Sequence, residues 1–66
     1  MTATVNGAPR ELPAGTTVAA LVAQLGAPGT GTAVAVDLEV VPRGAWERTT
    51  IPDGARVEVL TAVQGG

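Results

Sequence analysis

The stretch GTTVAALVAQLGAP, residues 15–28, predicts the one clear helix of the chain. Thr16 or Thr17 can cap the start of a helix. Gly26 stands where a left-handed C-cap belongs, and Pro28 prevents continuation. Apolar residues recur on one stripe at helical spacing, namely Val18, Leu21, Val22 and Leu25. A helix this short is marginal in water, so we expect it to be stabilised by packing on a sheet.

The residues before the helix predict a β-hairpin. TATV, residues 2–5, alternates polar and apolar side chains as a strand does. Asn6 and Gly7 follow, a pair that tolerates the positive φ angles of a type I′ turn. PRELP, residues 9–13, returns as a second strand with Leu12 inward, and its two prolines confine it to an edge or to strand ends.

The residues after the helix predict further strands of the same sheet. TAVAVDLEVVP, residues 32–42, is a third strand, either continuous or in two segments bent near Asp37. RGAWERTTIPDGA, residues 43–55, is irregular and ends in a turn at 52–54. RVEVLTAV, residues 56–63, closes the fold as a strand. Alternation places Ala3 and Val5 on one face of the first strand, and Val34 and Val36 on one face of the third. In the last strand it turns Val57 and Val59 inward and Arg56, Glu58 and Leu60 outward. The order predicts an α+β domain in which one helix lies on one sheet.

The amino-acid composition limits the classes of function that we expect of this single domain, residues 1–66. The chain has no Cys, His, Ser, Lys or Tyr, so almost every side chain used as a nucleophile or near-neutral acid–base group is missing. We therefore expect no enzymatic activity, no bound cofactor and no metal site. Four scattered arginines and a net charge of −2 argue against binding to nucleic acid or membranes. Without a basic leader or a long apolar run, the chain is expected to be cytoplasmic. We also expect it to be monomeric when free.

Three other features have plain structural interpretations. GAPGTGTA, residues 26–33, looks like a phosphate-binding loop but lacks its Lys and its hydroxyl residue, and it follows a helix instead of preceding one. Asp37 and Glu39 are two apart on a predicted strand, which favours a solvated sheet face over a metal site. Trp46, the sole aromatic residue, is expected to cap the core.

The last residues, TAVQGG, suggest a function. Two terminal glycines add no packing and are the costliest residues to order, so the tail is either accidental or used for its flexibility. A carboxylate on a stem without side chains can enter a narrow channel of another protein. Leu60 is predicted to face outward five residues before the diglycine, where an interface with such a partner would centre.

The whole chain resembles the ThiS family of sulfur carrier proteins. The resemblance is carried by TVNG…RELPAGTTVAALVAQLG, by VAV…LEVVPR…WERT and by DGARVEVLTAVQGG. One departure is Asp37, where related sequences often have Asn. The resemblance implies a ubiquitin-like β-grasp fold: a mixed sheet of four to five strands packed on one helix, with the first and last strands paired at its centre. It also implies a globular part, residues 1–62, and a flexible tail, residues 63–66.

The resemblance further implies a mechanism and partners. An adenylating enzyme would use ATP and Mg²⁺ to activate the carboxylate of Gly66. Sulfur from a cysteine desulfurase relay would then displace AMP and leave a thiocarboxylate, which thiazole synthase would consume. Gly65 would allow the tail to thread, and Leu60, Val63 and Gln64 would contact the partner.

Three alternatives stay open from the sequence. The recipient of the sulfur could instead belong to molybdopterin or cysteine synthesis. A ubiquitin-like modifier joined to target lysines would use the same tail. A plain interaction domain with an accidental tail would not need Gly66.

Overall fold

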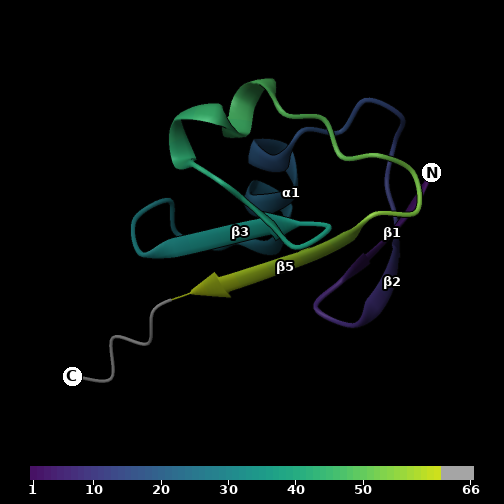
Figure 1. Ribbon diagram of the computed structural model, residues 1–66, viewed down its shortest axis with the longest axis horizontal. Coiled ribbons are helices and arrows are strands. Elements are labelled where there is room, and N and C mark those ends of the chain that lie inside the picture. The colour runs from purple at the N-terminus through teal and green to yellow at the C-terminus, as the bar shows by residue number, and fades with distance from the viewer. Residues whose placement is uncertain (62–66) are drawn as a thin grey trace.

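The computed structural model describes residues 1–61, which form a five-stranded sheet, one α-helix and one 3₁₀ helix (Figure 1). The elements in chain order are β1 (Thr2–Val5), β2 (Ala8–Glu11), α1 (Val18–Leu25), β3 (Thr32–Val36), β4 (Glu39–Val41), η1 (Arg43–Arg48) and β5 (Arg56–Thr61). The helix packs on one face of the sheet, as the sequence predicts for an α+β domain.

The sheet has the strand order β2-β1-β5-β3-β4. The first and last strands, β1 and β5, pair in parallel near its centre, while the other neighbours are antiparallel. This mixed topology confirms the predicted β-grasp arrangement. The proline-containing strand β2 lies at an edge, where a residue without an N–H leaves no gap in a ladder.

The predicted caps of α1 form, and they explain why the helix begins and ends where it does. Thr17 is the N-cap: its hydroxyl oxygen accepts a hydrogen bond from the backbone N–H of Ala20 at 3.1 Å. Gly26 adopts φ +71°, and its N–H donates to the carbonyl of Ala23. The N–H of Ala27 donates to the carbonyl of Val22, which completes a Schellman motif.

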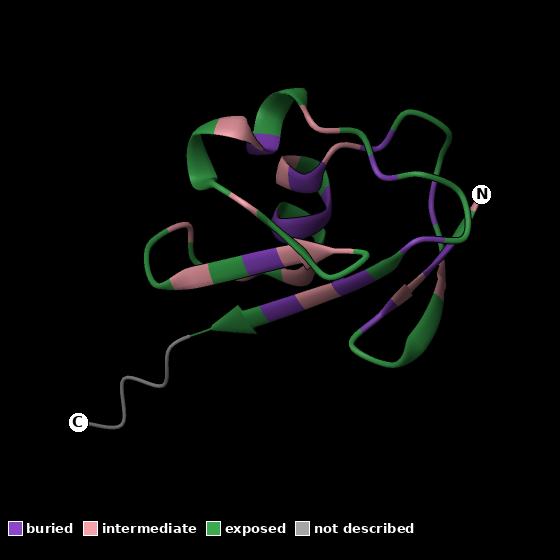
Figure 2. Cartoon of the chain, in the orientation of Figure 1, coloured by how far each residue is buried: buried purple, intermediate pink, exposed green. Residues whose placement is uncertain are grey.

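The core lies between α1 and the inner face of the sheet (Figure 2). Leu21 is fully buried and Leu12 nearly so. Leu25 and Val36 are only half-buried at its margin. The other buried apolar residues are Ala3, Val5, Val18, Val22, Val34, Trp46, Ile51, Ala55, Val57 and Val59.

The stretch 32–42 forms two strands, so the two-segment alternative is correct. Asp37 and Leu38 connect them in a tight turn, with φ angles of +50° and +71°. The prediction that Asp37 and Glu39 share one face of a strand was wrong, because Asp37 lies in the turn and Glu39 begins β4. Strand alternation cannot apply across residues with positive φ.

The segment predicted to be irregular contains the 3₁₀ helix η1, which sequence periodicity did not reveal. It places Trp46 in the core, where the indole N–H donates to the carbonyl of Val41 at 3.0 Å. The predicted turn follows: Gly54 has φ +80°, and the N–H of Ala55 donates to the carbonyl of Pro52. Glycine at this place suits a type II turn.

Among residues 1–61, no helix has the length and apolar character needed to cross a membrane.

Candidate functional site

The candidate site is the end of β5, which leads to the predicted reactive tail. Leu60 lies there and is 69% exposed, as strand alternation predicts. The other predicted site residues, Val63, Gln64, Gly65 and Gly66, lie outside the described residues. The structure therefore shows how the chain holds the strand that carries the tail.

One side of β5 is held by the ladder with β3. The two antiparallel strands pair from Val36 beside Val57 to Thr32 beside Thr61. The pairing thus extends to the last described residue, so the strand is fixed in direction up to the start of the tail. The side chain of Leu60 lies next to Ala33 on the face turned away from α1.

The other side of β5 is held by Asn6. The β1–β5 ladder covers only Thr4 beside Arg56 and Val5 beside Val57, since β1 ends at Val5. Asn6 continues it: its backbone N–H donates to the carbonyl of Val57 at 2.9 Å. Its side chain then pairs with the backbone of Val59, with Nδ2 donating to the carbonyl at 3.1 Å and Oδ1 accepting from the N–H at 2.8 Å.

Asp37 secures the opposite end of the same strand. Its Oδ1 accepts from the N–H of Arg56 at 2.9 Å, and its own N–H donates to the carbonyl of Arg56 at 2.7 Å. Two turn residues with positive φ, Asn6 and Asp37, therefore bind the backbone of β5 through their side chains. The Asn6-Gly7 pair predicts the first turn from the sequence. No sequence pattern predicts either of the two long-range contacts.

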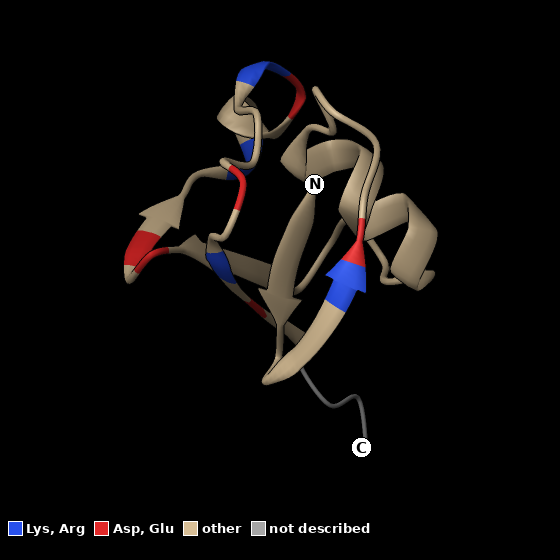
Figure 3. Cartoon of the chain, turned by 90° about the vertical axis from the view of Figure 1, so that its right-hand side faces the viewer, with Lys and Arg blue, Asp and Glu red and all other residues tan. Residues whose placement is uncertain are grey.

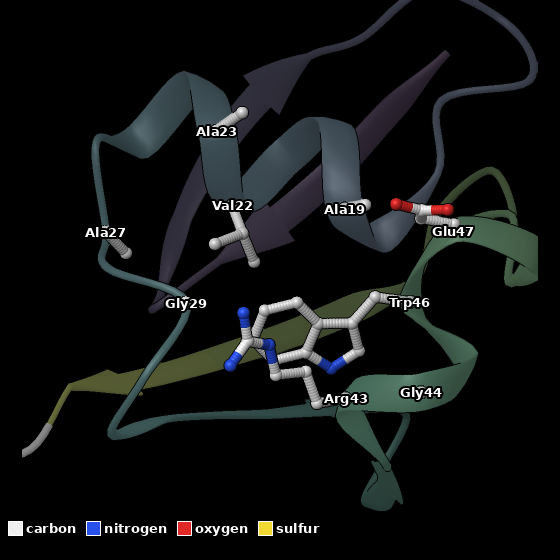
Figure 4. A pocket seen from close by; sticks show the side chains of 9 residues that line it. All are labelled: Ala19, Val22, Ala23, Ala27, Gly29, Arg43, Gly44, Trp46 and Glu47. Carbon is white, nitrogen blue, oxygen red and sulfur yellow. The ribbon is translucent and has the colours of Figure 1, made fainter.

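A hollow of about 670 Å³ lies on another side of the molecule, between α1 and η1 (Figure 4). The guanidinium of Arg43 packs closely on the backbone of Gly29: a Cβ built there would come within 2.6 Å of Nη2. Beside them the hollow is lined by Ala19, Val22, Ala23, Ala27, Gly44, Trp46 and Glu47. The lining is mostly aliphatic, and Arg43 and Glu47 are its charged side chains.

The charged side chains do not form a site among the described residues. The four arginines lie on three separate elements, β2, η1 and β5 (Figure 3). In residues 1–61, no three or more His, Cys, Asp or Glu side chains gather in a way that could hold a metal ion.

Comparison with known proteins identifies relatives over the full chain. The ThiS family model matches residues 3–66. A crystal structure of the thiamine biosynthesis protein ThiS from Geobacter metallireducens is 33% identical, with a TM-score of 0.82 and complete coverage of both chains. An NMR solution structure of a thiamine biosynthesis protein from the same organism is 35% identical, with a TM-score of 0.80, and covers all of this chain and 88% of that one.

A curated relative has a different architecture. It is a thiazole synthase of Paramagnetospirillum magneticum, 34% identical over 62 residues. The match covers 94% of this chain but only 19% of that protein, so the chain spans about a fifth of its length. In that organism, a segment similar to this chain is thus part of a longer protein that is named as the synthase.

Proposed function

The chain belongs to the ThiS family of small sulfur carrier proteins, which are not enzymes, and from this premise we propose that it carries sulfur as a thiocarboxylate on Gly66. The family match and the two thiamine biosynthesis proteins of similar structure support a role in the thiamine pathway. The observation that carries the proposal is that the family match continues to Gly66, beyond a strand that β3 pairs as far as Thr61 and that Asn6 binds at Val59.

The proposed chemistry takes place in partner active sites. An adenylating enzyme binds the carboxylate of Gly66 and, with ATP and Mg²⁺, converts it to an acyl-adenylate and pyrophosphate. The terminal sulfur of a persulfide on the relay protein attacks the acyl-adenylate and expels AMP, which gives an acyl disulfide between the carrier and the relay. A thiol then reduces this disulfide, forms a disulfide with the relay sulfur and releases the thiocarboxylate. A carboxylate is a poor electrophile, and adenylation supplies the leaving group that makes this substitution feasible.

The chain itself contributes positioning. Gly65 and Gly66 have no side chains to obstruct a narrow channel, and Leu60, Val63 and Gln64 are the proposed partner contacts. A firmly paired β5 supports delivery, because a tail on a fixed strand samples less space than one on a frayed end. Tethering the reacting group in this way lowers the entropic cost of the transfer step.

Thiazole synthase is the proposed recipient. Support comes from the Paramagnetospirillum protein, in which a similar segment is part of a longer protein named as this enzyme. A carrier and its acceptor that share one chain meet at high effective concentration. We infer that the chain described here meets the same class of acceptor.

The experiment that tests the function is intact-mass analysis of the protein isolated from its own cells, with fragmentation to localise any change. Exchange of one terminal oxygen for sulfur adds nominally the same mass as oxidation of Met1, so the shift must be assigned to a residue. A shift confined to Gly66 supports the carrier. An unmodified terminus under thiamine starvation, together with lysine-linked adducts on other proteins, would instead indicate a ubiquitin-like modifier.

The recipient is tested separately, with a deletion strain. Restoration of growth by added thiazole supports the thiamine role. A strain that lacks only molybdoenzyme activity, or that needs cysteine, would assign the sulfur to another pathway.

A further inference from the structure

The turn between β1 and β2 carries the only asparagine of the chain, Asn6, directly before Gly7. Asn6 has φ +50° and Gly7 has φ +83°, as a type I′ turn requires. Both residues are exposed, and beyond the adjacent residues no atom lies within 4 Å of a Cβ built on Gly7. Water therefore reaches a side-chain amide whose next backbone nitrogen has no steric cover.

An asparagine in this sequence context can lose its side-chain amide. The backbone nitrogen of Gly7 gives its proton to water or hydroxide, attacks Cγ of Asn6 and forms a new C–N bond. The Cγ–Nδ2 bond breaks, and Nδ2 takes up a proton and leaves as ammonia, so that a cyclic succinimide remains. Water then opens the ring at either carbonyl carbon, which gives aspartate or isoaspartate. Glycine favours the first step because it has no side chain to hinder the attack.

The folded chain holds the amide of Asn6 away from this reaction. Nδ2 donates to the carbonyl of Val59 at 3.1 Å, and Oδ1 accepts from the N–H of Val59 at 2.8 Å. Because Cγ is bonded to both of these atoms, it is held against β5. Ring closure requires Cγ to turn back to the nitrogen of Gly7, so both hydrogen bonds must break first. The rate of the reaction therefore depends on how often the side chain leaves β5.

The contact with Val59 depends on the amide nitrogen that the reaction removes. The N–H and C=O of Val59 point to the β1 side of β5, where β1 has already ended at Val5. An ionised aspartate at position 6 has only acceptor atoms, so nothing donates to the carbonyl of Val59, and a carboxylate oxygen faces that carbonyl oxygen. Isoaspartate also lengthens the backbone of the turn by one methylene group. Either product removes an attachment that β1 does not replace.

We propose that Asn6 is a deamidation site that its contact with Val59 protects, and that conversion of Asn6 releases β5 from the β1 side beyond Val57. Water is the only co-reactant, and loss of ammonia makes the change irreversible. The inference goes beyond the proposed function and does not depend on it, because it concerns the strand that precedes the tail, whatever the tail carries.

The first test follows conversion at Asn6 during incubation of the full chain at mildly alkaline pH, folded and in guanidinium chloride. Anion exchange separates the product, since conversion adds one negative charge to a chain of net charge −2. Peptide mass spectrometry assigns the mass gain of an amide-to-acid change to Asn6 or to one of the two glutamines. Conversion at Asn6 should be at least tenfold faster in denaturant. Equal rates in the two conditions, or no conversion in denaturant, would overturn the proposal.

Gly7→Val is the control for the reaction itself. Its branched side chain hinders the attacking nitrogen, so conversion at Asn6 in denaturant should be at least tenfold slower than in the unaltered chain. The measurement is made on the unfolded chain, where the φ of +83° at position 7 no longer matters. Conversion as fast as in the unaltered chain would rule out the succinimide route.

Hydrogen exchange measured by NMR tests whether the Val59 contact is the protecting one. The N–H of Val59 donates to Oδ1 of Asn6, so its exchange and the deamidation require the same opening. Folding should therefore slow deamidation at least as strongly as it slows exchange at Val59. A smaller protection of Asn6 than of the Val59 N–H would show that the reaction proceeds with the contact intact.

Asn6→Asp tests the consequence, because it reproduces the aspartate product. Its unfolding midpoint should fall, and exchange at the Val59 N–H should be at least tenfold faster. Ala20→Asp is the matched control: it adds the same charge at an exposed position of α1 and should leave exchange at Val59 within twofold. Asn6→Gly removes the same donor without adding a charge, and it replaces Asn6→Asp if circular dichroism shows that variant to be unfolded. Unchanged exchange at Val59 in the folded variants would overturn the release of β5.

Discussion

The side-chain amide of Asn6 forms two hydrogen bonds with the backbone of Val59, at 3.1 Å and 2.8 Å, across 53 residues of sequence. It replaces the ladder hydrogen bonds that β1 no longer supplies after Val5. Asn6 is also a turn residue, with φ +50°. One residue thus closes the first hairpin and anchors the strand that carries the tail.

Replacement of Asn6 by glycine separates these two roles. Glycine accepts the turn conformation, so Asn6→Gly removes only the two side-chain hydrogen bonds, and the free energy of unfolding should fall by about 1–2 kcal/mol. Urea denaturation followed by Trp46 fluorescence measures it. Ala8→Gly adds a glycine beside the same turn as a control. Equal stability of the two variants would show that the Val59 contacts contribute nothing.

Asp37 allows a test of the second anchor. Asp37→Asn keeps an oxygen that can accept from the N–H of Arg56 and tolerates positive φ, so stability should change by less than about 0.5 kcal/mol. Asp37→Ala removes the acceptor and should cost about 1–2 kcal/mol. Denaturation curves of the two variants measure both changes in the free energy of unfolding. An alanine variant as stable as the asparagine variant would contradict the assigned contact.

Leu38 is a site where the chain can be stabilised. Its φ of +71° is unfavourable for a branched side chain that is 79% exposed and contributes little packing. Leu38→Gly creates an Asp-Gly pair, which suits a type I′ turn, and should raise the free energy of unfolding by up to about 1 kcal/mol. The midpoint of thermal unfolding measures the change. A lower midpoint would mean that Leu38 makes a contribution its exposure does not reveal.

The core should be sensitive to truncation at α1. Leu21 is fully buried, and Leu21→Ala should cost about 2–5 kcal/mol through lost burial and a cavity. In a domain of this size, that is a large part of the total stability. Leu60→Ala makes the same chemical change at an exposed position and should stay within about 0.5 kcal/mol. Chemical denaturation of the pair provides the comparison, and similar losses in both would contradict the assigned core.

The threading role of Gly65 gives a prediction on activity. Gly65→Val adds a branched side chain to the tail and should lower the yield of thiocarboxylate at least tenfold in a reaction with the adenylating enzyme, while the unfolding midpoint stays unchanged. Ala8→Val, at an exposed position of edge strand β2, is the matched control and should react normally. A normal yield from Gly65→Val would exclude a narrow channel around this residue.

Local signals in the sequence determined much of the fold. The caps at Thr17 and Gly26, the Asn6-Gly7 turn and the buried stripe of α1 depend on interactions within a few residues, so they can be read directly from spacing and residue type. The outward position of Leu60 followed in the same way from the period of two in a strand. The parallel pairing of β1 and β5 was implied by the family resemblance, since no local pattern encodes it.

Tertiary structure decided what depends on distant partners. Nothing near Asn6 or Asp37 in the sequence shows that their side chains bind the backbone of β5, because those contacts exist only once the sheet has formed. The 3₁₀ helix η1 exists because Trp46 is buried against α1, not because of a periodic pattern. The strand register likewise places Ala33 beside Leu60 and Ala35 beside Val40, neighbours that exist only once the sheet has formed. Local sequence signals thus determined α1, the strands and the turns, while long-range hydrogen bonds and burial determined η1 and the way β5 is held beside its neighbours.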